Sequence, residues 1–303
     1  MHRYIGEAHY AAAIVGIQPC VRNMTLRLGD SVVNRLGYGT MRLVGEGAWG
    51  EPRDREHACK VLRRAAELGV NFFDTADAYG PAIAEELLRE ALHPYTGLVI
   101  ATKGGITRQG PAKAAPCGRP EYLHQCVEMS LRRLGVDTIE LYQLHRIDPL
   151  VPVEESLGKL VELREQGKLR HIGLSEVTVA QIEQARRVTR IASVQNKYNL
   201  SERKHEAMLE YCTANGIAFI PWYPVDAGRL NKPDGPFAEK AREKGITVLQ
   251  LSLAWLLNKS PVVLPIPGTY SLEHLEQNVA AAKVNLSEDE VEEIELIADT
   301  QAF

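Results

Sequence analysis

The chain alternates short apolar runs with longer amphipathic segments, and this alternation limits its fold more than any other feature. The apolar runs are rich in Val, Ile and Leu without regular polar interruption, which is typical of strands covered on both faces. Glycine follows several amphipathic segments, as at Gly69, Gly167 and Gly245, and a left-handed glycine commonly satisfies the last carbonyls of a helix. Strands that alternate with helices favour a parallel α/β architecture.

Eight such units can be placed along the 303 residues. The strands are expected near residues 36–41, 70–74, 97–102, 139–144, 171–174, 192–196, 217–222 and 262–266. The helices are expected near residues 54–68, 82–91, 119–134, 154–166, 178–188, 203–213, 236–258 and 271–282. This predicts a closed (β/α)8 TIM barrel, which typically takes ~250 residues. An open doubly wound sheet is the weaker alternative, because no G-x-G-x-x-G motif follows the first strand.

Both ends of the chain carry additions to this barrel. Gly29-Asp30 separates two short strand-like runs and predicts an N-terminal β-hairpin that plugs the bottom of the barrel. An extra C-terminal helix is expected near residues 288–299, packed on the outside. Residues 1–23 are expected to be a poorly ordered extension and 24–303 a single domain. A signal peptide is a weaker interpretation, since the apolar stretch there is short and no small-x-small site follows it.

Composition excludes several classes of function. The net charge is −4 and no block of Lys and Arg stands out, so neither nucleic acid nor an anionic membrane surface is expected as a partner. No apolar run approaches the ~20 residues of a membrane span. The five cysteines are scattered without a C-x-x-C pair, which favours free thiols in a reducing, cytoplasmic compartment over disulfides or a zinc site. The oligomeric state stays open, and a monomer is compatible with the sequence.

Three apolar runs end on ionisable residues, at Asp74, Lys103 and His145, and Tyr79 follows the first of them. Because parallel strands of a barrel end at one rim, these side chains are expected to meet there. A lysine cation beside a tyrosine favours the phenolate and lowers the tyrosine pKa from ~10. Tyr79 could then act as a general acid towards a carbonyl oxygen that His145 orients, with Asp74 pairing Lys103. Each residue alone has an ordinary structural interpretation, but four complementary groups at one rim are hard to obtain by chance.

Several motifs around these residues resemble the aldo-keto reductase superfamily, over about residues 26 to 297. They are Phe73-Asp74-Thr75-Ala76-x-x-Tyr79-Gly80, Ala101-Thr102-Lys103-Gly104, Leu131-x-x-Leu134-x-x-Asp137-x-Ile139-x-Leu141-Tyr142-x-Leu144-His145 and Pro265-Ile266-Pro267-Gly268-Thr269. The resemblance implies a barrel that binds NADPH, with NADH also possible, without a Rossmann fold. It further implies hydride transfer to an aldehyde or ketone, no metal, and Asp74, Tyr79, Lys103 and His145 as the catalytic residues.

The resemblance also assigns residues to the cofactor. They are Ser175, Gln195, Trp222, Gly268, Thr269 and Asn278. Trp222 would stack on the nicotinamide, Ser175 and Gln195 would bind its carboxamide, and Asn278 would contact the adenine. Gly268 and Thr269 precede a predicted helix whose N-terminus suits a phosphate.

Two departures from the family pattern leave questions open. Glu176 stands where the family usually has asparagine, and a carboxylate cannot donate a hydrogen bond to the carboxamide oxygen. Tyr270 and His274 stand where members that prefer NADPH often carry a cation, so no clear clamp for the 2′-phosphate is visible. Trp49 is a candidate wall of the substrate pocket, and residues 104–118 are a candidate lid.

Two other functions remain as alternatives to a carbonyl reductase. One is an NADPH-binding barrel that senses redox state or regulates a channel without significant turnover. The other is an unrelated barrel lyase in which Lys103 forms a Schiff base. That chemistry needs a neutral lysine, which a neighbouring Asp74 opposes.

Overall fold

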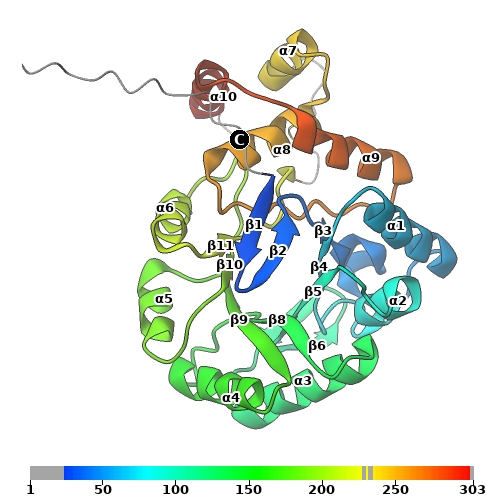
Figure 1. Cartoon of the computed structure of the whole chain (residues 1–303), viewed down its shortest axis with the longest axis vertical. Helices are drawn as coiled ribbons and strands as arrows, with labels where there is room; N and C mark the ends of the chain where they lie inside the picture. The colour runs from blue at the N-terminus through cyan, green and yellow to red at the C-terminus, as the bar shows by residue number, and fades with distance from the viewer. Residues whose placement is uncertain (1–23, 227–229, 231–234, 301–303) are drawn as a thin grey trace, which may run out of the picture.

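The computed structural model of the chain describes residues 24–226, 230 and 235–300. Its centre is a curled parallel sheet of seven strands in the order β11-β10-β9-β8-β5-β4-β3, with helices around the outside (Figure 1). The strands are β3 (Tyr38–Gly39), β4 (Phe72–Asp74), β5 (Val99–Gly104), β8 (Ile139–Leu144), β9 (Leu169–Ser175), β10 (Ser193–Gln195) and β11 (Ala218–Phe219). The expected strands are present, although β3 ends early, where a 3-10 turn begins at Thr40.

The segment 262–266 closes the barrel between β11 and β3. The Leu264 amide donates to the Phe219 carbonyl at 2.8 Å, and the Gly37 amide donates to the Pro265 carbonyl at 2.9 Å. This segment was expected to be a strand, and it lies in the eighth position with a single bridge to Phe219. Pro265 and Pro267 have no amide hydrogen, so a continuous ladder cannot form.

Amphipathic helices cover the barrel, with their apolar faces against the sheet. They are α1 (Arg55–Glu67), α2 (Ile83–Leu92), α3 (Pro120–Leu134), α4 (Val153–Glu165), α5 (Val179–Arg186), α6 (Glu206–Asn215), α7 (Pro236–Glu243), α8 (Val248–Lys259) and α9 (Leu272–Ala280). The single helix expected over 236–258 is wrong, because the chain turns at Gly245 (φ 65°) and α8 begins with a capping box of Thr247 and Gln250. Helix α6 begins later than expected, at Glu206, after a turn in which Asn199 and Glu202 exchange backbone hydrogen bonds.

A two-stranded hairpin lies across the N-terminal ends of the barrel strands. It consists of β1 (Thr25–Leu28) and β2 (Ser31–Asn34) around Gly29 at φ 63°. A side chain on Gly29 would collide with the His171 ring at the start of β9. The Asn34 backbone amide donates to the side-chain oxygen of Asn71, just before β4, at 2.7 Å. The predicted hairpin is therefore present at this end of the barrel, while residues 1–23 lie outside the described part of the chain.

Two further features complete the architecture. Helix α10 (Glu288–Thr300) packs outside α7 and α8 through Lys244–Glu290 at 2.5 Å and the Trp255 indole on Glu295 at 3.0 Å. The expected lid region contains a hairpin that the sequence did not predict, of β6 (Ile106–Gly110) and β7 (Lys113–Pro116). Within the described ranges, no helix is both long and apolar enough to cross a membrane.

Candidate active site

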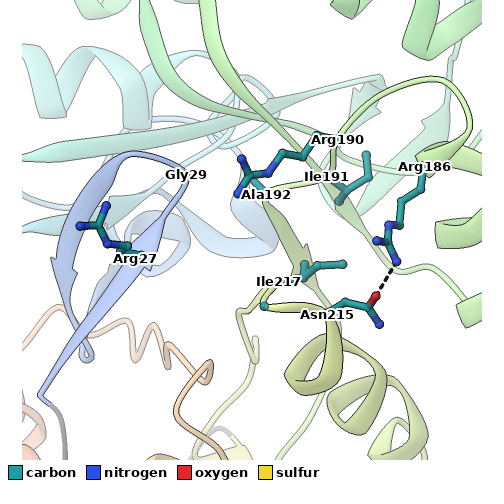
Figure 2. A pocket seen from close by; sticks show the side chains of 9 residues that line it. Arg27, Gly29, Arg186, Arg190, Ile191, Ala192, Asn215 and Ile217 are labelled. Carbon is teal, nitrogen blue, oxygen red and sulfur yellow. Dashed lines mark hydrogen bonds between the residues drawn. The ribbon is translucent and has the colours of Figure 1, made fainter.

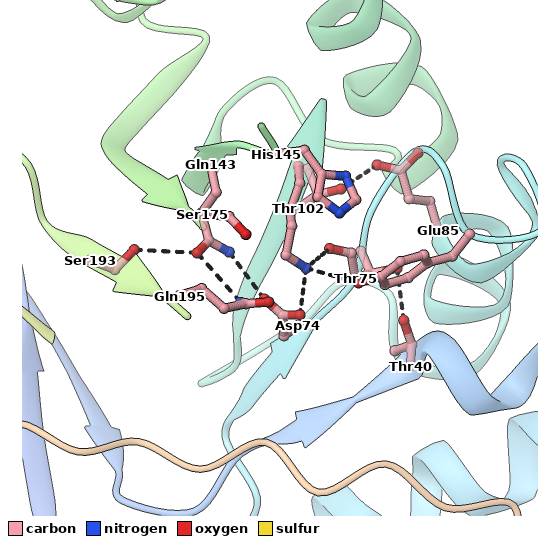
Figure 3. A network of polar contacts seen from close by, with 12 residues as sticks. Thr40, Asp74, Thr75, Glu85, Thr102, Gln143, His145, Ser175, Ser193 and Gln195 are labelled. Carbon is pink, nitrogen blue, oxygen red and sulfur yellow. Dashed lines mark hydrogen bonds and ion pairs between the residues drawn. The ribbon is translucent and has the colours of Figure 1, made fainter. Parts of the chain in front are cut away.

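A buried polar network that includes Asp74, Gln143 and His145 lies at the carboxyl ends of β4, β5 and β8 (Figure 3). The Lys103 ammonium is at its centre. Its Nζ donates to Asp74 Oδ1 at 2.5 Å and to the Thr75 carbonyl at 2.8 Å. It also reaches the Tyr79 hydroxyl oxygen at 3.4 Å. The four residues expected at one rim therefore do come together, with Lys103 fully buried between the carboxylate and the phenol.

Two glutamines hold the second oxygen of Asp74. The side-chain nitrogens of Gln143 and Gln195 donate to Asp74 Oδ2 at 3.0 and 2.8 Å (Figure 3). Gln195 thus supports the Asp74 carboxylate, and its predicted contact with the carboxamide stays a prediction. Gln143 was not predicted as a member of the site, although the sequence carried a signal for it. It is a polar residue two positions before His145 and shares its side of the strand.

The protonation of Tyr79 differs from the sequence prediction. Burial raises the pKa of Tyr79 more than the Lys103 charge lowers it, so its net pKa lies above the ordinary value. The predicted effect of Lys103 has the right direction, but the prediction of a lowered pKa is wrong because it left out desolvation. A tyrosine that stays protonated remains a proton donor to an oxygen that becomes an alkoxide, which is a much stronger base.

The charges of the other two groups are well defined. Burial lowers the pKa of Lys103, but Asp74 and Tyr79 raise it more, so the amine stays cationic. Burial and then the Lys103 charge hold the pKa of His145 well below its usual range, so the imidazole is neutral. Its ring meets Tyr79 edge-on at 5.9 Å between centroids, and its buried Nδ1 has no hydrogen-bond partner among the described residues.

Trp222 is anchored at the same rim by Glu176. Glu176 Oε1 accepts from the Trp222 indole Nε1 at 2.5 Å and from the Lys197 backbone amide at 2.8 Å. The carboxylate that departs from the family pattern thus holds the predicted stacking residue. Glu176 adopts φ 55°, which places its side chain outside the run of strand β9. The sequence offered no signal for this pairing, because 46 positions separate the two residues.

Ser175 has a partner that sequence analysis did not anticipate. Its hydroxyl oxygen accepts from Arg146 Nη1 at 3.0 Å, and the same nitrogen donates to the His145 carbonyl at 2.7 Å. The Ser175 hydroxyl hydrogen is left for another acceptor. Ser175 therefore lies where the catalytic end of β8 meets the predicted cofactor-binding end of β9.

Gly268, Thr269 and Asn278 lie around helix α9, away from the lysine network. Ser271 caps the helix by accepting from the His274 amide, and the Thr269 hydroxyl accepts from the Ser271 amide at 3.0 Å. Asn278 is buried on the same helix. Tyr270 turns towards helix α1, donating to the Asp54 carbonyl at 2.7 Å. The Tyr270 side chain is thus engaged with helix α1, and the predicted role of Gly268 and Thr269 in binding a phosphate stays a prediction.

Trp49 belongs to a loop that is pinned beside the tyrosine. The Gly50 amide donates to the Gly80 carbonyl at 2.7 Å, directly after Tyr79. Arg108 from strand β6 lies over the Trp49 ring at 5.6 Å and donates to the Ala78 carbonyl at 3.1 Å. The position of Trp49 fits a wall of the substrate pocket, which stays a prediction.

A cavity of about 260 Å³ lies at the opposite end of the barrel (Figure 2). Its lining residues come from the bottom hairpin and from the segments that precede β10 and β11, and they include Arg27, Arg186, Arg190 and Ile217. Arg186 is held there by Asn215 at 2.7 Å. None of the predicted catalytic residues lines it, so it is separate from the candidate active site. In the part of the chain that the structure describes, no cluster of His, Cys, Asp or Glu could hold a metal ion.

The chain belongs to the aldo/keto reductase family, whose model matches residues 35–299. It is 51% identical over 265 residues to an uncharacterised oxidoreductase of Schizosaccharomyces pombe, covering 88% of this chain and 87% of that protein. It is 43% identical over 272 residues to the pyridoxine 4-dehydrogenase of Escherichia coli, covering 88% and 95%. A crystal structure of a Klebsiella pneumoniae aldo-keto reductase in complex with NADPH has a TM-score of 0.77 at 28% identity, covering 90% and 94%. The family and the (β/α)8 barrel predicted from the sequence motifs are thereby confirmed.

Proposed function

We propose that this protein is an NADPH-dependent carbonyl reductase that converts an aldehyde or ketone to an alcohol, with Tyr79 as general acid. The observation that carries the proposal is the Lys103 ammonium, bonded to Asp74 at 2.5 Å and within 3.4 Å of the Tyr79 hydroxyl. This geometry keeps a cation beside a protonated phenol at the rim of the barrel.

Each residue has one task in this reaction. Tyr79 donates its hydroxyl proton to the carbonyl oxygen as negative charge develops there, and the Lys103 cation stabilises the phenolate that remains. Asp74, held by two glutamines, keeps Lys103 charged and in place. The neutral His145 ring, edge-on to Tyr79, orients the carbonyl oxygen by a hydrogen bond. Because Lys103 stays cationic, the geometry does not favour the alternative Schiff-base lyase.

The residues present fit a nicotinamide dinucleotide. Trp222, fixed by Glu176, offers a flat ring at the rim, and the α9 N-terminus offers backbone amides to a phosphate. When bound, the reduced cofactor supplies the hydride for the carbonyl carbon. Support for NADPH comes from the related Klebsiella structure in complex with it. Tyr270 and His274 provide no clear means of preferring it over NADH, so the preference rests on that relative.

The relative in Escherichia coli suggests a substrate to try first. Its name describes the oxidation of pyridoxine at carbon 4, and the reverse of that reaction reduces the aldehyde of pyridoxal. We include pyridoxal among the proposed substrates of this protein, beside simple aromatic and aliphatic aldehydes.

Tyr79→Phe tests the proposal. Removing the phenolic proton donor should lower kcat by roughly 10²- to 10⁴-fold. Binding of NADPH, followed by quenching of tryptophan fluorescence, should change little because the phenol does not hold the cofactor. An equal loss of cofactor affinity would show that Tyr79 is structural.

A second measurement separates an enzyme from a sensor. Oxidation of bound NADPH by an aldehyde is followed in a single turnover and in the steady state. An enzyme continues to turn over at a comparable rate, whereas a redox-sensing or channel-regulating barrel oxidises its bound cofactor once and then stops. The second outcome would favour the alternative.

A further inference from the structure

Arg146 is fixed directly beside the catalytic histidine by two hydrogen bonds. Its Nη1 donates to the His145 carbonyl at 2.7 Å and to the Ser175 hydroxyl at 3.0 Å. These bonds use both hydrogens of that nitrogen, and they come from the ends of two neighbouring strands, β8 and β9. Because a guanidinium is planar, two acceptors on one nitrogen also fix the direction of the rest of the group.

The charge of Arg146 affects the pKa values of Tyr79 and His145, the two groups that would hold the carbonyl oxygen of the substrate. Burial raises the pKa of Tyr79, and Arg146 is among the charges that lower it. Burial lowers the pKa of His145, and Arg146 lowers it further. Since the Tyr79 and His145 rings are in edge contact, Arg146 borders the place where a carbonyl oxygen would bind.

Arg146 makes no ion pair with any described residue, although it is partly buried. Glu176 is close enough to raise its pKa, but Glu176 Oε1 is already bonded to the Trp222 indole and the Lys197 amide. Desolvation lowers the pKa of Arg146, which means that the partial burial of this cation is unfavourable in free energy. Within the described ranges, its Nε and Nη2 make no hydrogen bond with the protein. These two nitrogens form the edge of a guanidinium that best matches an anionic oxygen.

We propose that the free edge of Arg146 binds an anionic oxygen carried on the carbon adjacent to the one that bears the reacting aldehyde group. The site would then prefer aldehydes with an ionised hydroxyl or a carboxylate at that position. The anionic oxygen should lie close to the reacting carbonyl because Arg146 follows His145 in the chain and donates to the His145 backbone carbonyl oxygen. Pyridoxal, with a hydroxyl at carbon 3 beside the aldehyde at carbon 4, is a member of this class. The inference rests on the proposed carbonyl reduction and adds its substrate class.

Two aldehydes that differ by one hydroxyl test the inference. They are 3-hydroxypyridine-4-carbaldehyde and pyridine-4-carbaldehyde, compared by kcat/KM with the intact protein, Arg146→Met and Arg146→Lys. The intact protein should prefer the hydroxylated aldehyde by roughly 10- to 100-fold, the range expected of a charge-assisted hydrogen bond. Arg146→Met should bring this ratio close to one, chiefly through KM of the hydroxylated aldehyde. Arg146→Lys should give an intermediate ratio, because the charge remains without the planar fork.

The outcomes separate this inference from the proposed function. If the intact protein reduces both aldehydes and Arg146→Met leaves their ratio unchanged, the inference fails and the reductase stands. If Arg146→Met lowers both activities equally, Arg146 only positions His145 and Ser175, which also overturns it. If the same substitution weakens NADPH binding in a fluorescence titration while the ratio is kept, Arg146 binds the cofactor instead. If neither aldehyde is reduced by the intact protein, the proposed function fails and the inference fails with it.

Discussion

Burial and neighbouring charge act in opposite directions on the ionisable side chains at the rim of the barrel. For Lys103 the contribution of Asp74 exceeds that of burial, so the amine is charged. For Tyr79 burial exceeds the contribution of Lys103, so the phenol is protonated. For His145 burial and the Lys103 charge act in the same direction and lower its pKa, so the imidazole is neutral. Burial therefore accounts for the protonated phenol, and burial together with the Lys103 charge accounts for the neutral imidazole beside it.

The buried carboxyl group of Asp77, two residues before Tyr79, should make the free energy of unfolding depend on pH. Its Oδ1 is buried without a hydrogen-bond partner, although the residue as a whole is partly exposed. Burial, and then the charge of Glu85, raise its pKa to about 7. The folded state thus holds this proton more tightly than the unfolded chain, for which the pKa is ~3.9. Its stabilising contribution is full below pH ~4 and is lost as the pH rises to about 7.

Asp77→Asn should remove this dependence. The free energy of unfolding of the variant, relative to the unmodified protein, should increase between pH 5 and pH 8 by roughly 3 kcal/mol. Urea denaturation at the two pH values measures the difference. The exposed Asp137→Asn serves as a control and should show no such trend. If the free energies of unfolding of Asp77→Asn and of the unmodified protein differed by the same amount at both pH values, the raised pKa of Asp77 would be contradicted.

The hairpin of β6 and β7 joins two loops that carry predicted site residues. Arg108 on β6 donates to the Gly47 carbonyl at 2.8 Å and to the Ala78 carbonyl at 3.1 Å, so it connects the Trp49 loop to the Tyr79 loop. Backbone hydrogen bonds between Ala48, Gly50 and Gly80 continue this connection. One side chain of this element thus restrains both segments.

Arg108→Met should loosen both loops without unfolding the barrel. The two charge-assisted hydrogen bonds from Arg108 to the loops are lost, each worth roughly 1.5–3 kcal/mol. Amide exchange in residues 45–50 and 78–82 should therefore accelerate by about tenfold or more, as measured by hydrogen–deuterium exchange. Lys113→Met, at an exposed position of the same hairpin, should leave exchange unchanged. Equal protection in the two variants would show that the backbone bonds alone hold the loops.

The whole barrel depends on a closure that contains few backbone hydrogen bonds. The segment 262–266 carries prolines, so side chains take part in joining it to the first strand. Arg35, just before β3, is buried and donates to the carbonyls of Leu257 at 2.9 Å, Val263 at 3.2 Å and Ser260. A single guanidinium therefore ties the start of the barrel to its end, more than 220 residues later.

Arg35→Met should destabilise the whole molecule. It leaves buried carbonyl oxygens without donors, at a cost of about 3–5 kcal/mol in the free energy of unfolding. Urea denaturation followed by far-UV circular dichroism measures this loss. Arg27→Met, at an exposed position on the bottom hairpin, should change the free energy by no more than about 0.5 kcal/mol. A loss below about 1 kcal/mol for Arg35→Met would show that the backbone closes the barrel unaided.

Local pattern determined most of the secondary structure and four members of the site. Continuous apolar runs identified the strands, because a strand covered on both faces has no polar side. Asp74, Lys103 and His145 stood out because each ends such a run, and the rule that parallel strands end at one rim brought them together. The split between α7 and α8 was missed although Gly245 was visible, because the apolar periodicity continues across it.

Contacts between distant positions could be decided only by the tertiary structure. The pairing of Glu176 with Trp222, the support of Asp74 by Gln143 and Gln195, and the closure by Arg35 all join segments far apart in the chain. The raised pKa of Tyr79 belongs to the same group, since desolvation depends on how the whole barrel packs around the phenol. Sequence by itself determined which groups reach the rim, because periodicity and chain order are local. Packing decided their partners and their protonation, because both depend on three-dimensional neighbours.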